Sequence, residues 1–176
     1  MRNIASLSTK LVRIGAALLV VALVSIGLTL WVTWQLGGGA AALNEAGRMR
    51  MQTWRLTSTV QAQMDETEVH LLVKQFDDSI ELLRNGDSSR PLFVPWSPVV
   101  RTQFQFVELA WQQQKAILLK RPQMERVKLV QAADQFLLVI DGFVFSIEHQ
   151  LSSLTAILNL FQLLMMALAI GAAVIM

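Results

Sequence analysis

An arginine-rich stretch from Leu43 to Leu56 carries the residues best suited to binding chemistry. The stretch contains Arg48, Arg50 and Arg55 but only one acid, Glu45, so it attracts anions. A guanidinium group is planar and permanently charged, and its N–H groups can donate hydrogen bonds to the oxygens of a small anion. The stretch therefore indicates an anion-binding surface.

The position of Arg50 within this stretch matters more than the total charge. Asn44 is a suitable N-cap residue, and arginine and methionine favour helix, so we expect the first turns of a helix here. One set of residues repeats at intervals of three and four and forms a stripe away from the core: Leu43, Gly47, Arg50 and Trp54. Gly47 on this stripe would let another helix come close to Arg50. A solvated basic patch is the alternative interpretation of the same charges.

Eight residues of the stretch resemble the signature of a known sensor family, the NarX/NarQ nitrate/nitrite sensor histidine kinases. The signature Asn-x-Ala-Gly-x-x-Arg-Met-Gln-x-x-Arg-Leu is matched in order and spacing by Asn44, Ala46, Gly47, Arg50, Met51, Gln52, Arg55 and Leu56. Related sensor modules occur in PilJ-type transducers. Thr53 and Trp54 replace the usual Ser-Tyr pair, and Arg48 replaces what is often a small residue. These departures could alter affinity or anion choice.

The resemblance implies a membrane-bound sensor of nitrate or nitrite. In such a sensor the anion binds at a homodimer interface, and the signal passes to a histidine kinase and then to a response regulator. The matched positions make Arg50 and Gly47 the expected ligand-binding residues, with Asn44, Met51 and Arg55 as candidate supporting residues. The kinase part would lie after residue 176.

Two other functions are compatible with the same residues. A chemotaxis or pilus transducer would carry this kind of sensory module without a kinase on the chain, and a small membrane scaffold would bind no ligand. The residues after Met176 would distinguish the first two, because a kinase needs an acceptor histidine and an ATP-binding segment whereas a chemoreceptor needs a long coiled-coil hairpin.

The composition indicates a membrane protein. Of the 176 residues, 53% are hydrophobic, and the mean hydropathy of +0.46 is too high for an ordinary soluble domain. The chain has no cysteine, which excludes a disulfide framework and a thiolate metal site. Arg2, Lys10 and Arg13 precede the first acid, and the remaining charges nearly balance, which argues against a nucleic-acid partner.

Two uncharged runs are candidates for membrane helices. Residues 14–34 are numerous enough, at about 1.5 Å per residue, to cross a hydrocarbon core of roughly 30 Å. The basic residues before this run predict a cytoplasmic N-terminus, and Trp31 and Trp34 suit the opposite interface. A signal peptide cleaved near Gly37 is the alternative, but the apolar run is longer than a signal peptide needs. The second run extends from Leu151 to Met176.

These runs predict the organisation of the chain in a bacterial inner membrane. We expect a cytoplasmic N-terminus (1–13), a first transmembrane helix (14–36), a periplasmic sensor domain (37–150) and a second transmembrane helix (151–176). The expected fold class is all-α, with an up-down four-helix bundle in the periplasm flanked by the two transmembrane helices. The run from Gly37 to Gly39 would end the first membrane helix or loosen its join to the sensor, as a hinge or as a plain linker.

Apolar periodicity predicts the core of the bundle. The pattern is helical from about Ala41 to Arg84, with one buried stripe made of Met49, Leu56, Val60, Met64, Phe76, Ile80 and Leu83. The proline-containing segment Arg90 to Pro98 cannot be regular helix, and we expect its apolar residues to cap the far end of the bundle.

Two further helices follow in the sequence. The first is expected to end around Lys120 to Pro122, and its buried stripe is Val100, Phe104, Val107, Trp111 and Leu118. The second is expected to start near Glu125 and to continue into the second apolar run, and its stripe is Val130, Ala133, Leu137, Ile140, Val144, Ile147 and Leu151.

Outside the arginine-rich stretch, the sequence offers only weak candidates for chemistry. Glu66 and His70 have the spacing of a metal-binding pair, but no second histidine lies nearby, so an exposed acidic face is the preferred interpretation. His149 could respond to pH, although an interfacial residue is again preferred. Nothing resembles a nucleophile with its base, a phosphate-binding loop or a catalytic carboxylate pair. We therefore expect no catalytic residue, no cofactor and no metal in this chain.

Overall fold

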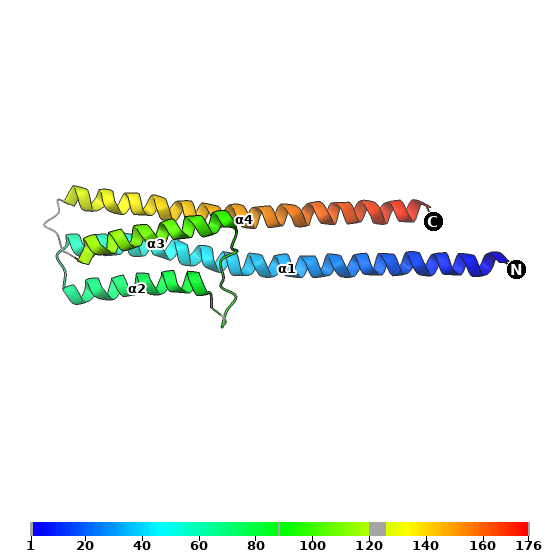
Figure 1. Cartoon of the computed structure of the whole chain (residues 1–176), viewed down its shortest axis with the longest axis horizontal. Helices are drawn as coiled ribbons and strands as arrows, with labels where there is room; N and C mark the ends of the chain where they lie inside the picture. Colours follow the sequence, from blue (N-terminus) through cyan, green and yellow to red (C-terminus); the bar gives the residue numbers. More distant parts are fainter. Residues whose placement is uncertain (1, 88, 120–125, 176) are drawn as a thin grey trace. The chain divides into compact units, whose positions relative to one another are not determined.

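The computed structural model describes residues 2–87, 89–119 and 126–175, with side chains for residue 9 and for residues 12–171 within these ranges. The described residues form four helices, α1 (Arg2–Gln61), α2 (Glu66–Asn85), α3 (Pro98–Leu119) and α4 (Arg126–Ile175) (Figure 1). The predicted all-α class is confirmed.

The helices divide into two compact units. Met1–Trp34 and Ser152–Met176 form one, called here the apolar unit, and Gln35–Leu151 form the other, called the four-helix unit. α1 and α4 contribute to both units, whereas α2 and α3 lie entirely within the four-helix unit. The cytoplasmic, transmembrane and periplasmic placements of the predicted domains stay predictions.

The apolar unit has the surface of a membrane-associated protein. α1 and α4 each contain a stretch that is long and apolar enough to cross a membrane. Large apolar side chains on both helices are exposed, among them Leu19, Leu23, Leu160 and Leu164. So much contiguous apolar surface is unfavourable in water, and it is compatible with a lipid environment. Within this unit the side-chain amide of Gln162 donates a hydrogen bond to Thr29 Oγ1 over 3.5 Å.

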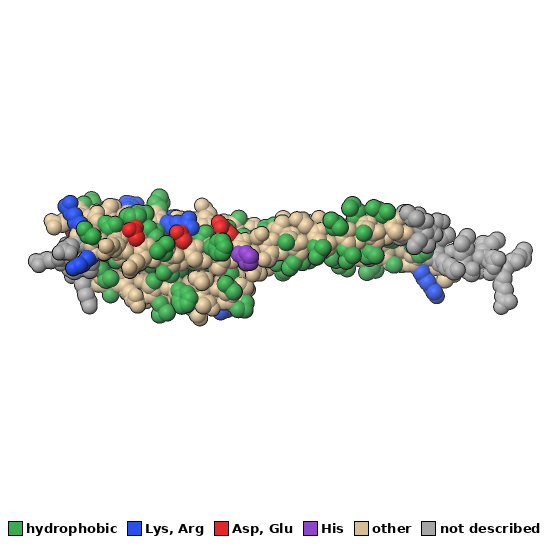
Figure 2. Space-filling model, turned by 90° about the horizontal axis from the view of Figure 1, so that it is seen from above, with side chains coloured by type: hydrophobic (Ala, Val, Ile, Leu, Met, Phe, Trp, Pro, Cys, Tyr) green, Lys and Arg blue, Asp and Glu red, His purple; other side chains and the backbone are tan. Residues whose placement is uncertain are grey.

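One hydrophobic core joins the four helices of the four-helix unit. Consecutive helices run in opposite directions in this unit (Figure 1). Phe76 of α2, Trp111 of α3 and Phe136 of α4 stack at the core, with ring centroids 4.0 Å apart for Phe76 and Trp111 and 5.9 Å apart for Trp111 and Phe136. Burying one such side chain contributes about 1.5–3 kcal/mol. Nearly all charged side chains visible in Figure 2 lie over this unit.

The long helix predicted from Ala41 to Arg84 is in fact two helices. α1 ends at Gln61 and α2 begins at Glu66, with Gln63 in the left-handed backbone region at φ 53°. The turn between them contains no glycine or proline, so no breaker signal marks it in the sequence. Its backbone is closed instead by the bonds from Gln63 N to Val60 O and from Met64 N to Thr59 O. The predicted stripe therefore comes from two antiparallel helices, and Met64 is exposed.

The stripes predicted for the later helices are mostly confirmed. All five residues predicted for α3 are buried. On α4, five of the seven predicted residues are buried, while Val130 and Leu137 are partly exposed, and Phe136 and Phe143 complete the core. α4 also continues without a break into the second apolar run, as predicted. The predicted helix end at residues 120–122 and the predicted start at Glu125 lie outside the described residues.

The three consecutive glycines do not end a helix, so the first of the two predicted roles is wrong, and a loosened join stays a prediction. α1 passes through Gly37, Gly38 and Gly39 without interruption. A Cβ at Gly38 would overlap the ring of Phe93, and a Cβ at Gly39 would lie 2.6 Å from the side chain of Leu151. The lack of a side chain at Gly38 and Gly39 is therefore explained by the close packing of Phe93 and Leu151 against α1.

The proline-containing segment lies at the opposite end of the four-helix unit from the one predicted. Phe93 packs on Gly38, which is close to where α1 enters this unit. An up-down order explains this position, because the connection between the second and third helices returns to the end where the first helix entered. Leu92 and Val94 are buried, so the segment does cap the core, as predicted, but at this end.

Candidate functional site

α1 presents its three arginines on two different faces. Arg48 and Arg55 are seven residues apart, so they share a face, whereas Arg50 is rotated by about 200° from Arg48. Asn44, predicted as an N-cap, lies deep inside α1, which begins at Arg2. The N-cap prediction is wrong because the apolar run and the sensor stretch form one continuous helix.

Arg50 lies beside α4 and pairs with Asp141. Arg50 Nε is 2.6 Å from Asp141 Oδ1, and the side chains are 41% and 51% exposed. Arg50 Nε is itself buried and has no hydrogen bond of good geometry, so the contact is an ion pair with a poorly aligned donor. Arg50 is outside the hydrophobic core, as predicted, whereas Leu43 of the same stripe packs against that core.

Gly47 lies one turn before Arg50, beside open space. A Cβ at Gly47 would meet no atom within 4 Å. Close packing within this chain therefore does not explain Gly47, in contrast to Gly38 and Gly39. Trp54, on the same stripe, is 46% exposed. A partly exposed arginine side chain, with open space at a glycine and an exposed indole nearby, forms a surface that could accept an anion, a second helix, or both.

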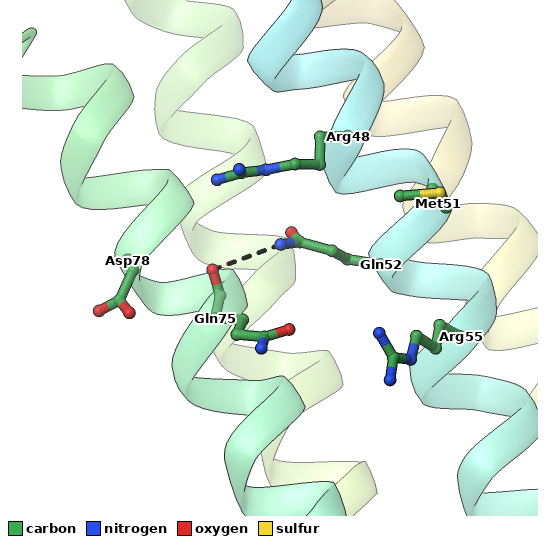
Figure 3. A pocket seen from close by; sticks show the side chains of 6 residues that line it. All are labelled: Arg48, Met51, Gln52, Arg55, Gln75 and Asp78. Carbon is green, nitrogen blue, oxygen red and sulfur yellow. Dashed lines mark hydrogen bonds between the residues drawn. The ribbon is translucent and has the colours of Figure 1, made fainter.

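A groove on another face of α1 contains the other two arginines. The groove has a volume of about 330 Å³, lies between α1 and α2, and is lined by Arg48, Met51, Gln52, Arg55, Gln75 and Asp78 (Figure 3). Arg48, Gln52 and Arg55 extend from α1 toward α2 (Figure 3). Of the predicted supporting residues, Met51 and Arg55 line this groove, and Asn44 is exposed. The structure thus separates Met51 and Arg55 from Arg50.

A polar network closes the end of the groove where Arg48 lies. Arg48 Nη2 lies 2.6 Å from Oε1 of the buried Glu45 and 3.4 Å from Ser79 Oγ. Ser79 Oγ donates to Gln52 Oε1 over 3.3 Å, and Gln52 Nε2 donates to the backbone oxygen of Gln75 over 3.5 Å. Arg48 therefore forms a local ion pair with Glu45, three residues earlier on the same helix. These bonds also fix how α1 and α2 are aligned.

Sequence reasoning did not identify Gln75, Asp78 or Asp141. Asp141 is far from Arg50 in the chain, and no local spacing connects them. The spacing of Arg48, Gln52 and Arg55 at four and three residues was the available signal for the groove, because such residues share one helix face.

No metal site is formed within residues 2–87, 89–119 and 126–175, where no three acidic or histidine side chains lie close enough to hold an ion. His70 Nε2 is 3.8 Å from Glu66 Oε1, and both side chains are more than half exposed. His149 stacks against Phe145, with ring centroids 6.3 Å apart.

Comparison with known families identifies the class of domain. The family model for PilJ, the N-terminal region of type IV pili methyl-accepting chemotaxis transducers, matches residues 31–136, which is more than half of the chain. The chain belongs to the PilJ family. The match begins on α1 before the glycine run, contains α2 and α3, and ends within α4. No curated protein matches the chain.

The PilJ match supports only part of the family resemblance found in the arginine-rich stretch. It supports a sensory module of the chemotaxis or pilus transducer kind and gives no support to a NarX/NarQ kinase in particular. Of the functions weighed from the sequence, the transducer module that was the alternative fits better than the nitrate-sensing kinase.

Proposed function

We propose that this PilJ domain is the membrane-anchored sensory module of a chemotaxis or pilus transducer. The single observation that carries the proposal is the PilJ match across the helices that form one hydrophobic core. The anchor is supported by the two long apolar helices, and the cytoplasmic placement of the N-terminus by the basic residues before residue 14. The four-helix unit would then lie on the periplasmic side of the inner membrane.

The ligand proposed for the module is nitrate or nitrite, bound at Arg50. The match of the stretch from Asn44 to Leu56 to the nitrate/nitrite signature supports this choice, and so does the partial exposure of the Arg50 side chain. Asp141 is a built-in competitor, because its carboxylate already contacts Arg50 Nε. An anion that binds Arg50 would weaken this pair between α1 and α4, and it can change the signalling state only by binding the two arrangements differently.

The proposed module acts as a homodimer through the face that contains Gly47 and Arg50. In a two-fold dimer the same face meets itself, so the two copies of Arg50 would approach each other. Their repulsion would be relieved by an anion placed between them. The open space at Gly47 supports close approach of a second helix. The downstream partner, a kinase with its response regulator, stays a prediction.

A chimera tests whether the domain signals in response to the anion. Residues 1–176 are fused to the cytoplasmic signalling part of a chemoreceptor, and control of the receptor's kinase is measured with and without nitrate and nitrite. We expect an anion-dependent change that is absent in Arg50→Ala. A chimera that is present in the membrane but gives the same output with and without both anions would contradict the proposal. Arg84→Gln, at an exposed α2–α3 ion pair far along the sequence from Arg50, serves as the control variant.

A further inference from the structure

Two opposite charges line the α1–α2 groove without a charged partner among the described residues. Arg55 lines it from α1 and Asp78 lines it from α2. Among the residues that the structure describes, neither side chain lies within ion-pair distance of an oppositely charged group. Arg48, by contrast, is balanced by Glu45. Besides the paired and half-exposed Arg48, the groove is therefore lined by one unpaired cation and one unpaired anion.

The alignment of the two helices separates these charges along the groove. Gln52 of α1 contacts Gln75 of α2. Arg55 follows Gln52 by three residues and Asp78 follows Gln75 by three residues. Because the helices are antiparallel, the two residues are displaced in opposite directions, each by about 4.5 Å. Arg55 and Asp78 therefore mark the two ends of a groove segment roughly 9 Å long at the backbone.

Amide groups occupy the space between the charges. Gln52 is held by Ser79 and by the backbone of Gln75. The side-chain amide of Gln75 also lines the groove and makes no hydrogen bond within the described part of the chain. An amide can donate and accept, so it can serve either end of a polar ligand.

We propose that this groove binds an extended zwitterion, a small molecule with a carboxylate at one end and an ammonium group at the other. The carboxylate would pair with the guanidinium of Arg55, and the ammonium with the carboxylate of Asp78. A groove of about 330 Å³ has room for such a molecule. A plain anion is a poorer fit because Asp78 would repel it, and an α-amino acid is too short to reach both ends.

This second site is independent of the proposed nitrate response. It lies on another face of α1 from Arg50 and shares no residue with the Arg50–Asp141 pair. Failure of either proposal therefore leaves the other untouched. A ligand at the groove would bridge α1 and α2, whereas an anion at Arg50 acts between α1 and α4.

A length series of ω-amino acids tests the proposal on the full chain in lipid nanodiscs. The probes are glycine, 4-aminobutyrate, 5-aminovalerate and 6-aminohexanoate, with hexanoate and hexylamine as probes that carry one charge each. Calorimetric titration should show binding of at least one of the longer amino acids, with glycine and both single-charge probes about tenfold weaker or more. Equal binding of hexanoate would overturn the zwitterion, and so would the absence of binding by all three longer amino acids.

Matched variants locate the binding. Arg55→Gln and Asp78→Asn should each weaken binding of the best probe by about tenfold or more. Lys74→Gln and Glu81→Gln remove the same charges from exposed positions on α2 that do not line the groove, and they should change the affinity by less than about twofold. Circular dichroism confirms that each variant is folded. Unchanged affinity in a folded Arg55→Gln or Asp78→Asn variant would place the probe elsewhere and refute the site.

Discussion

At the scale of single residues, the pair formed by Arg50 and Asp141 matters most for the proposed anion response. Both side chains are about half exposed, and exposed ion pairs contribute only about 0–1 kcal/mol. A pair this weak can be displaced by a ligand of modest affinity. Asp141 thus contacts Arg50 without closing the proposed site to anions.

Removing the charge of Asp141 should strengthen nitrate binding. Asp141→Asn takes away the competing carboxylate, and the energy of an exposed pair limits the gain to about fivefold. Titration of nitrate into the full chain in nanodiscs measures the change. Asp134→Asn, at an exposed α4 position one heptad earlier, should leave the affinity unchanged. Weaker binding in Asp141→Asn would mean that Asp141 supports the anion site instead of competing for it.

A second residue-scale prediction concerns Asp87 in the turn after α2. Hydrogen bonds from the side chain and backbone of Ser89, aided by Arg90, lower the pKa of Asp87 below its ordinary value of 3.8. Because the folded pKa is the lower one, the stabilising effect is present above pH 3.8 and is lost as the pH falls through the folded pKa. The backbone amide signal of Ser89, followed by NMR, should titrate with a midpoint below pH 3.8. A midpoint at or above that value would contradict the hydrogen-bonded turn.

At the scale of the helices, replacing two adjacent glycines of α1 by alanine should change stability in opposite directions. Gly37→Ala meets no atom within 4 Å, so it should stabilise the helix by up to about 1 kcal/mol. Gly38→Ala would place a methyl group against the ring of Phe93, so it should lower the melting temperature or displace that ring. Thermal unfolding of the two variants, which differ by one position, compares the effects directly. Equal stabilisation by both would show that the contact with Phe93 is unimportant.

The helices themselves could largely be predicted from the sequence, but their connections could not. Apolar residues that repeat at intervals of three and four predicted most of the buried faces of α3 and α4, because burial of an apolar stripe governs helix packing. The turn after Gln61 was missed because its residues, Ala62 and Gln63 among them, are compatible with helix. Tertiary packing of α2 against the core overrides that local preference.

The candidate site was predictable only where it depended on one helix. The off-core position of Arg50 followed from its spacing to Gly47 and Trp54. The Asp141 partner and the α2 wall of the groove depend on how separate helices meet, and a single sequence contains no direct signal for that. The glycine run was misjudged for the same reason, since its packing partner Phe93 comes from a distant segment.

At the scale of the whole molecule, we expect a homodimer with Gly47 near its axis. A cysteine in place of Gly47 in this cysteine-free chain should cross-link between two subunits in membranes. A cysteine in place of Leu109, which is exposed on α3, is the control and should cross-link far less. Preferential cross-linking at Leu109 would reject the proposed interface. Cross-linking at neither position would reject the dimer.

The proposed function requires that this PilJ domain bind a small anion through Arg50. Calorimetric titration of nitrate and nitrite into the full chain in lipid nanodiscs, for the wild type and for Arg50→Ala, Arg50→Lys and Arg55→Gln, tests it most directly. We expect the wild type to bind at least one anion, and Arg50→Ala to lose binding while staying folded. Arg50→Lys should bind poorly, because the point charge of lysine lacks the planar fork of a guanidinium group. Arg55→Gln should bind as the wild type does. Equal affinity in the wild type and in a folded Arg50→Ala variant would contradict the claim.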